Sequence, residues 1–255
     1  MSFCPRPSWN SWLGYNAYVI VLSIDTCDPR GSVALLREDA VLGLIAHETK
    51  DEYSSWLLPA VHQTLKGAGL AMMDVEGYAA AAGPGSFTGV RVGLTTVKAW
   101  AEVYGKPVAA ISRLEAIAAQ AAGPADFVAA FVDAQRGQVF GAIYRSEDGS
   151  LARVGEEMVI APVRFVELAT ELSNGGKIAW ISLDGALVAA ESVWKGREDE
   201  GESIEGASPV LAGIIGRIGI RRLLSGKGTD ALALDANYVR RSDAEIFWKG
   251  ASHGH

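Results

Sequence analysis

Apolar residues recur along the chain in two spacings, one typical of strands and one typical of helices. Short apolar runs predict buried strands, at 19–25, 32–36, 40–47 and 78–82. Apolar positions three and four residues apart predict helices, over 53–67 and 89–104. Gly105 and Pro107 mark the end of the second helix, because proline cannot continue a helix. We expect the first three strands to form an antiparallel meander, followed by a helix, a strand and a helix.

The second part of the chain repeats this pattern with different residues. Its apolar runs predict further elements, strands at 107–111, 126–133 and 138–144 and helices at 113–122 and 209–225. In both parts an apolar strand ends in an acid, Asp25 or Asp133, and a turn with Arg and Gly leads into the next strand. The repetition indicates internal duplication. The organisation that we expect is an N-terminal extension and two α/β halves, at 1–17, 18–106 and 107–255.

The composition is that of a globular chain without a nucleic-acid-binding face of its own. The 255 residues are 49% hydrophobic, enough to bury a sizeable core. The formal net charge of −7 disfavours unaided binding to nucleic acid, which needs positive charge to displace counterions from phosphates. The two cysteines, Cys4 and Cys27, form no ligand set with histidines, and we expect a reducing cytoplasm. No apolar run reaches the length of a membrane span, so we expect no membrane contact.

A glycine-rich run, GPGSFTGVRVGL at 83–94, links a predicted strand to a predicted helix. Pro84 and Gly85 favour a tight turn, and we expect Thr88 to cap the helix by accepting a backbone N–H. The spacing matches neither the dinucleotide-binding fingerprint nor the Walker A loop.

Two uses of this run remain open. The amides of the first helical turn can cradle a phosphate, with contacts from Gly83, Gly85, Ser86 and Thr88. Alternatively, the run is a closely packed corner in which Gly89 and Gly93 let another backbone approach.

The same run resembles the signature of the TsaB (YeaZ-like) family, in which Gly-Pro-Gly-Ser-Phe-Thr-Gly-x-Arg-x-Gly-Leu opens a helix. Three further segments resemble the family at similar places, LSIDT at 22–26, VDAQRGQVF at 132–140 and YVRR at 238–241. The resemblance covers residues 19–245, nearly the whole chain. It implies an actin-like α/β fold of two duplicated ribonuclease H-like halves, which agrees with the repeated pattern.

TsaB proteins are partners in threonylcarbamoyl transfer to the adenosine next to the anticodon of tRNAs. The resemblance implies a non-catalytic subunit that forms a heterodimer with a TsaD-type subunit, has a TsaE-type ATPase as a further partner, and reaches tRNA through the complex. It implies no cofactor required by this chain, with ADP or ATP as a weak ligand in the complex. The rival interpretation is a free-standing actin-like ATPase or kinase, or a peptidase. A homodimer would use the same apolar surface as the heterodimer.

In active actin-like enzymes the acid after the first strand helps to hold a metal and phosphates, which makes Asp25 and Thr26 candidates here. Asp133 and Arg136 occupy the corresponding place in the second half. The alternative is that each acid organises its own turn by accepting from the amides that follow. The His-x-x-x-His pair by which TsaD holds its metal is missing, and Tyr53 stands where family members often place a histidine. We therefore expect no metal site and no catalytic residue.

The two helices at 53–67 and 89–104 carry more apolar surface than one layer of a domain needs. Either the chain's own loops bury this surface, or the outer faces of the helices meet a partner. The resemblance implies the second, because TsaB proteins pair with TsaD through the first two helices of each N-terminal half. The residues that we expect at the partner interface are Trp56, Leu57, Val61, Leu65, Val90, Leu94, Val97 and Ala101.

Overall fold

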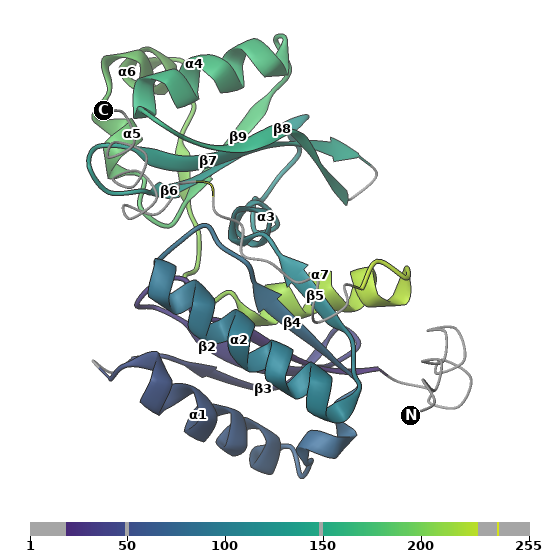
Figure 1. Ribbon diagram of the computed structural model, residues 1–255. Helices are drawn as coiled ribbons and strands as arrows, with labels where there is room; N and C mark the ends of the chain where they lie inside the picture. Colours follow the sequence, from purple (N-terminus) through teal and green to yellow (C-terminus); the bar gives the residue numbers. More distant parts are fainter. Residues whose placement is uncertain (1–18, 49–50, 148–149, 229–238, 240–255) are drawn as a thin grey trace, which may run out of the picture.

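The computed structural model describes residues 19–48, 51–147, 150–228 and 239. These residues form two α/β halves, drawn one above the other in Figure 1. The extension expected at 1–17 lies outside the described residues, as does the segment at 238–241 apart from Val239. None of the helices that the structure describes is long and apolar enough to cross a membrane.

The first half is a five-stranded sheet with helices on both faces. The strands follow the order β3-β2-β1-β4-β5, with bounds β1 Ile20–Asp25, β2 Ser32–Arg37, β3 Ala40–Ala46, β4 Gly77–Ala81 and β5 Val108–Ile111. The first three strands pair antiparallel, as the apolar runs predict, and β4 and β5 add in parallel. One face is covered by α1 (Tyr53–Gly67) and α2 (Phe87–Tyr104) and the other by α7 (Ala212–Leu224), and a 3₁₀ turn, η2 (Met72–Asp74), follows α1 (Figure 1).

The second half has the same kind of sheet. Its strands follow the order β10-β9-β6-β7-β8, with bounds β6 Phe127–Asp133, β7 Val139–Glu147, β8 Ser150–Ile160, β9 Ile178–Ser182 and β10 Ile204–Gly206. Three helices pack together on its outer side, α4 Pro162–Ser173, α5 Ala186–Ala189 and α6 Ser192–Asp199 (Figure 1). The short helix α3 (Arg113–Ala118) lies between the halves and contacts β6, β7 and β9 as well as α7.

The two sheets correspond strand by strand. Taken in reverse, the second sheet runs β8-β7-β6-β9-β10, and its central strand β6 pairs antiparallel with β7 and parallel with β9. The strand β1 has the same two kinds of neighbour in β2 and β4. The predicted duplication is therefore confirmed, and the fold is actin-like α/β.

The predicted range of the second half, 107–255, is wrong at both of its ends, because it includes two elements that belong to the first half. β5, expected in the range 107–255, is the edge strand of the first sheet and pairs with β4. α7 also packs on the first sheet, where Gly216 and Gly219 let it approach closely, since a Cβ at position 219 would lie 2.5 Å from the Cβ of Ala79. The helix expected at 113–122 ends at Ala118. Local periodicity predicts that a helix is half-buried but does not say which sheet it covers.

Candidate functional site

The glycine-rich run packs directly against the residues that follow β1. A side chain at position 89 would overlap the carbonyl oxygen of Thr26, and one at position 85 would overlap the carbonyl oxygen of Cys27. A Cβ at position 93 would lie 2.5 Å from Thr26 Oγ1. Interiors are packed so closely that such overlaps force the backbone apart. The interpretation of Gly89 and Gly93 as positions of close backbone approach is therefore confirmed.

Hydrogen bonds fasten the same corner to its surroundings. Thr26 Oγ1 donates to the Gly89 carbonyl at 2.6 Å. The Arg113 amide, at the start of α3, donates to the Gly83 carbonyl at 2.7 Å. The loop between β4 and α2 is thus tied to β1 on one side and to α3 on the other.

The start of α2 differs from the prediction by two residues. The helix begins at Phe87, and the hydroxyl of Ser86 accepts from the Gly89 amide at 3.3 Å, so Ser86 is the cap and the expected cap at Thr88 is wrong. The Ser86 amide in turn donates to the Cys27 carbonyl at 2.6 Å. Of the residues expected to contact phosphate, Ser86 and Thr88 are exposed, whereas the backbone at Gly83 and Gly85 makes contacts within the chain.

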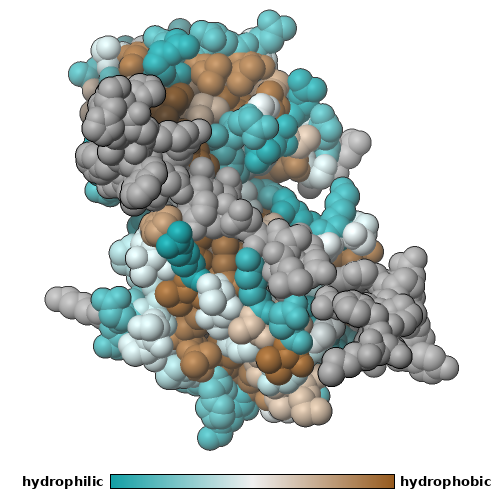
Figure 2. All heavy atoms as spheres, viewed as in Figure 1, coloured by the Kyte–Doolittle hydropathy of each residue, from teal (hydrophilic) through white to brown (hydrophobic). Residues whose placement is uncertain are grey.

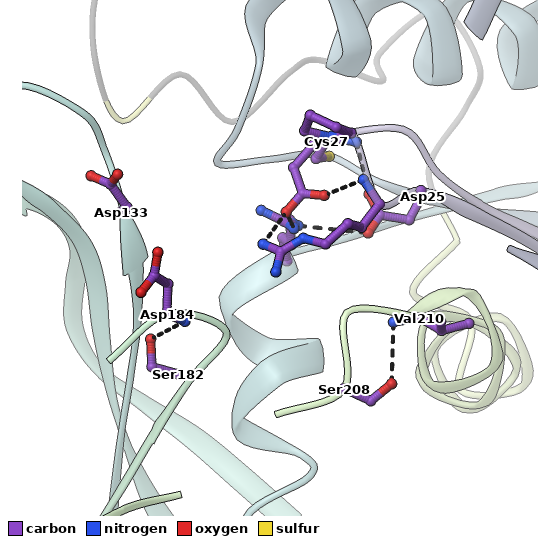
Figure 3. Close-up of polar contacts among 12 residues, drawn as sticks. Asp25, Cys27, Asp133, Ser182, Asp184, Ser208 and Val210 are labelled. Carbon is purple, nitrogen blue, oxygen red and sulfur yellow. Dashed lines mark hydrogen bonds and ion pairs between the residues drawn. The ribbon is translucent and has the colours of Figure 1, made fainter. Parts of the chain in front are cut away.

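Two acids and one arginine form an ionic group at the carboxyl end of β1. Asp25 ends the strand and is 1% exposed, and Arg113 begins α3 and is 3% exposed. The Nε of Arg113 lies 3.6 Å from Asp25 Oδ2. Its Nη2 donates to Oδ2 of Asp28, whose side chain is 16% exposed. Figure 3 shows Asp25 of this group beside Cys27, whose amide donates to it. We call Asp25, Asp28 and Arg113 the ionic group below.

The acids that end β1 and β6, and Asp28 in the turn after β1, also accept from the amide two residues later, the geometry of an Asx turn. The pairs are Asp25 with Cys27 at 2.9 Å, Asp28 with Arg30 at 2.7 Å and Asp133 with Gln135 at 2.6 Å. The alternative prediction for Asp25 and Asp133, that each organises its own turn, is therefore confirmed.

Burial and Arg113 act in opposite directions on the two acids of the ionic group. Burial raises the pKa of Asp25, and Arg113 at 3.6 Å offsets this only in part. Burial also disfavours ionisation of Asp28, but its direct contact with Arg113 and its bonds from Arg30 outweigh the effect, so the pKa of Asp28 is lowered. For Arg113, burial alone would lower the pKa, and the two acids raise it instead. The guanidinium therefore stays charged in the interior.

The predicted groups of the second half lie on the other side of the junction between the halves. Figure 3 shows Asp133 and Asp184 together at the ends of β6 and β9, across from Asp25 and Cys27. The Asp184 amide donates to Ser182 Oγ at 3.0 Å. Arg136 lies at the exposed tip of the turn between β6 and β7, with a positive φ of 60°.

The ionic group does not fit the metal and phosphates that active actin-like enzymes hold near this acid. The positive charge that a metal would supply is already supplied by Arg113, buried beside both acids. In the described part of the chain, no group of three or more His, Cys, Asp or Glu residues is placed to hold a metal ion. Tyr53, at the position expected for a histidine, makes structural contacts instead: its hydroxyl donates to the Asp28 carbonyl and accepts from the Gly31 amide at 2.7 Å.

Arg113 and Asp28 were not among the residues predicted for the site. One signal was present: Arg113 is the first residue of its helix, where the helix dipole opposes a positive charge, so an acidic partner was to be expected. That partner lies 85 positions away in the sequence. A local pattern cannot identify a contact over such a separation.

The interface residues predicted on α1 and α2 face the chain's own core. Their exposed fractions are 5% or less, for Leu57, Val61, Leu65, Val90, Leu94, Val97 and Ala101. Trp56 is partly buried and packs against the same core. The prediction that the first seven meet a partner is wrong, because α1 packs on β2 and β3 and α2 on β4, and these side chains fill the space between.

Other positions on the same helices expose apolar side chains. Val103 is 75% exposed, Leu58 is 56% exposed and Phe87 is 39% exposed. The guanidinium carbon of Arg91 lies 3.6 Å from the centroid of the Phe87 ring. Figure 2 shows hydrophobic residues among polar ones on the lower half of this view, where α1 and α2 lie in Figure 1. We call Leu58 and Val103, the two that are more than half exposed, the outer helix face.

Comparison with known proteins agrees with this geometry. A family model described as "TsaD: tRNA N6-adenosine threonylcarbamoyltransferase" matches residues 37–199. The chain is 34% identical over 151 residues to the "tRNA threonylcarbamoyladenosine biosynthesis protein TsaB" of Bacillus subtilis, an alignment that covers 59% of this chain and 66% of that protein. The Escherichia coli protein of the same name is 33% identical over 157 residues, with 60% and 68% covered. The chain belongs to the TsaB (YeaZ-like) family within this TsaD group.

A solved structure of the TsaB family extends the match to the whole fold. "YeaZ from Pseudomonas aeruginosa" is 26% identical and superposes with a TM-score of 0.69, covering 86% of this chain and 99% of that chain. The chain spans about two thirds of the length of the two curated TsaB proteins. The resemblance carried by the glycine-rich run is therefore confirmed for the family.

Proposed function

We propose that this chain is the TsaB-type subunit of a system that transfers a threonylcarbamoyl group to the adenosine next to the anticodon of tRNAs. It pairs with a TsaD-type transferase, works with a TsaE-type ATPase and reaches tRNA through the complex, in the cytoplasm. The names of the Bacillus subtilis and Escherichia coli relatives support a role in threonylcarbamoyladenosine biosynthesis. The chain requires no cofactor of its own, and ADP or ATP binds weakly, in the complex.

The observation that carries the pairing is the outer helix face. Leu58 and Val103 are more than half exposed on helices whose inner sides are already filled by core residues. Covering apolar surface stabilises a complex by about 25 cal/mol per Å² removed from water. The helices α1 and α2 contact each other and lie on the same face of the first sheet, so they present two adjacent ridges to a partner's helices (Figure 1). A second copy of the chain competes for this face.

The nucleophilic and acidic groups of the described residues support a partner role over a free-standing ATPase or peptidase. Cys27 is fully buried, and burial raises its pKa well above the ordinary value of a thiol, so little thiolate forms. Asp25 is held beside Arg113 and Asp133 accepts from its own turn. These groups serve the fold.

The test is a reconstituted modification assay. Unmodified tRNA, threonylcarbamoyl-adenylate, a TsaD-type transferase and a TsaE-type ATPase are incubated with and without this chain, and the modified nucleoside is measured by mass spectrometry. We expect product only when the chain is present with its partners. Product from the chain alone, or equal product without it, contradicts the proposal.

Two surface variants connect the assay to the outer helix face. Val103→Asp places a charge on that face and should lower product at least about tenfold at limiting subunit concentration. Leu224→Asp is the matched control, because Leu224 is 49% exposed at the end of α7 on the opposite side of the first sheet. An equal loss of product with both variants would contradict pairing through the outer helix face.

A further inference from the structure

The most unusual feature outside the outer helix face is the buried cation of the ionic group. Arg113 belongs to α3, which lies between the halves, yet its guanidinium reaches Asp25 at the end of β1 and Asp28 in the turn that follows. It is 3% exposed, so it has lost nearly all of its contact with water. Such a burial is unfavourable unless acids nearby compensate the charge. The position at the start of a helix adds to the cost, because the helix dipole is positive there.

The contact between Arg113 and Asp25 is one of charge rather than of hydrogen bonding. Within the described residues, neither Arg113 Nε nor Asp25 Oδ2 has a hydrogen-bond partner, and the two atoms lie 3.6 Å apart. Asp28 Oδ2, in contrast, accepts from Arg113 Nη2 and also from Arg30 Nη2, the latter at 3.0 Å. Arg113 therefore neutralises Asp25 across a short gap while it is held in place by Asp28.

Without Arg113 the two carboxylates would face the same space with no positive charge between them. Asp25 Oδ2 is buried and directed at the place of the guanidinium. Two carboxylates that converge on one space are the kind of oxygen ligands that small divalent cations take. The guanidinium in that space supplies the positive charge itself, and at 3% exposure it is not accessible to a phosphate from solution.

We propose that Arg113 is a tethered counter-ion that fills the place of a divalent cation between Asp25 and Asp28. This place in the first half is thereby closed to a metal ion. Because the Arg113 amide also donates to the Gly83 carbonyl at 2.7 Å, one residue joins α3, the glycine-rich corner and the turn after β1. The proposal goes beyond the proposed function and holds whether or not the chain pairs with a transferase.

The experiment is a cation titration of the full chain followed by thermal unfolding. Wild type, Arg113→Ala and Arg30→Ala are compared in Mn²⁺ at increasing concentration, with ionic strength held constant by choline chloride. Arg30→Ala is the matched control, since Arg30 contacts the same carboxylate of Asp28 but is 50% exposed. A ligand that binds only the folded state raises Tm with its concentration.

We expect the Tm of Arg113→Ala to rise by roughly 5 °C or more when Mn²⁺ exceeds its Kd a hundredfold. Wild type and Arg30→Ala should not respond, and the double variant Arg113→Ala with Asp28→Asn should lose the response. An Arg113→Ala variant that folds but ignores Mn²⁺ overturns the proposal. A wild-type response as large as that of the variant also overturns it.

A second variant covers the case in which Arg113→Ala does not fold. Arg113→Met combined with Asp25→Asn removes the cation and the acid that it neutralises, while keeping side chains of similar length. If Arg113 acts as a counter-ion, this double variant regains a cooperative unfolding transition. If it remains unfolded, Arg113 is needed for its packing and the proposal is overturned.

Discussion

Adding a single methyl group at Gly89 tests the interpretation of the glycine-rich run. A Cβ at this position would overlap the carbonyl oxygen of Thr26 and lie 3.2 Å from its carbonyl carbon. Both atoms belong to the backbone after β1, so no side chain can rotate away, and either α2 or the turn must move. Overpacking of this kind costs about 1–3 kcal/mol. The movement also weakens the 2.6 Å hydrogen bond from Thr26 to the Gly89 carbonyl, worth about 1 kcal/mol.

Helix propensity acts in the opposite direction. Replacing glycine by alanine inside a helix raises the free energy of unfolding by about 1 kcal/mol. With the two unfavourable effects included, we expect Gly89→Ala to lower the free energy of unfolding by on the order of 1–3 kcal/mol in total. For a chain of this size, that corresponds to a fall in Tm of roughly 2–12 °C. Gly196→Ala is the matched control, because Gly196 lies inside α6 with nothing within 4 Å of an added Cβ, and it should gain stability.

The assay is thermal and urea unfolding of the three proteins, followed by circular dichroism. A Gly89→Ala variant as stable as wild type, measured beside a stabilised Gly196→Ala, would refute close packing as the reason for Gly89. A lower stability of both variants would indicate an effect of alanine that is unrelated to the contact with Thr26.

Two further predictions concern the core and the ionic group. Leu94→Asp should lower the free energy of unfolding by on the order of 5 kcal/mol, because Leu94 is 4% exposed in the core. A variant with the Tm of wild type would contradict the placement of Leu94 in the core. For Asp28, the lowered pKa means that its ionised form stabilises the fold above the ordinary pKa of about 4, and that this contribution is lost as pH falls through the folded-state pKa. Asp28→Asn should therefore be less stable than wild type at pH 7, and its stability should fall less than that of wild type between about pH 5 and pH 2, as measured by urea unfolding. An equal fall in the two proteins would contradict the pairing of Asp28 with Arg113.

The elements of the first half and the duplication were predictable because they rest on local patterns. The helix expected at 53–67 has those bounds in the structure, since its apolar positions recur at helical spacing. The acids Asp25 and Asp133 each end a central strand, as the repeated strand-and-turn pattern predicted. The family was predictable from the glycine-rich run, whose residues are fixed by the contacts of Gly85, Gly89 and Gly93 with the turn after β1.

The features that the sequence did not predict depend on contacts between distant segments. The hydroxyl of Ser23 donates to the Ala212 carbonyl across 189 positions, and this contact places α7 on the first sheet rather than the second. Asp28, the partner of Arg113, lies 85 positions away from it. On α2, the stripe with Leu94 and the side with Val103 are both apolar, so periodicity alone could not decide which of them the sheet covers.

The most direct test of the central claim is the affinity of the purified chain for a TsaD-type transferase, measured by isothermal titration calorimetry. We expect wild type and Leu224→Asp to bind with equal affinity and one-to-one stoichiometry. Val103→Asp should bind at least about tenfold more weakly, while its Tm stays close to that of wild type, because Val103 is 75% exposed. Binding of Val103→Asp as tight as that of wild type, or no heat of binding with wild type at all, would contradict pairing through the outer helix face.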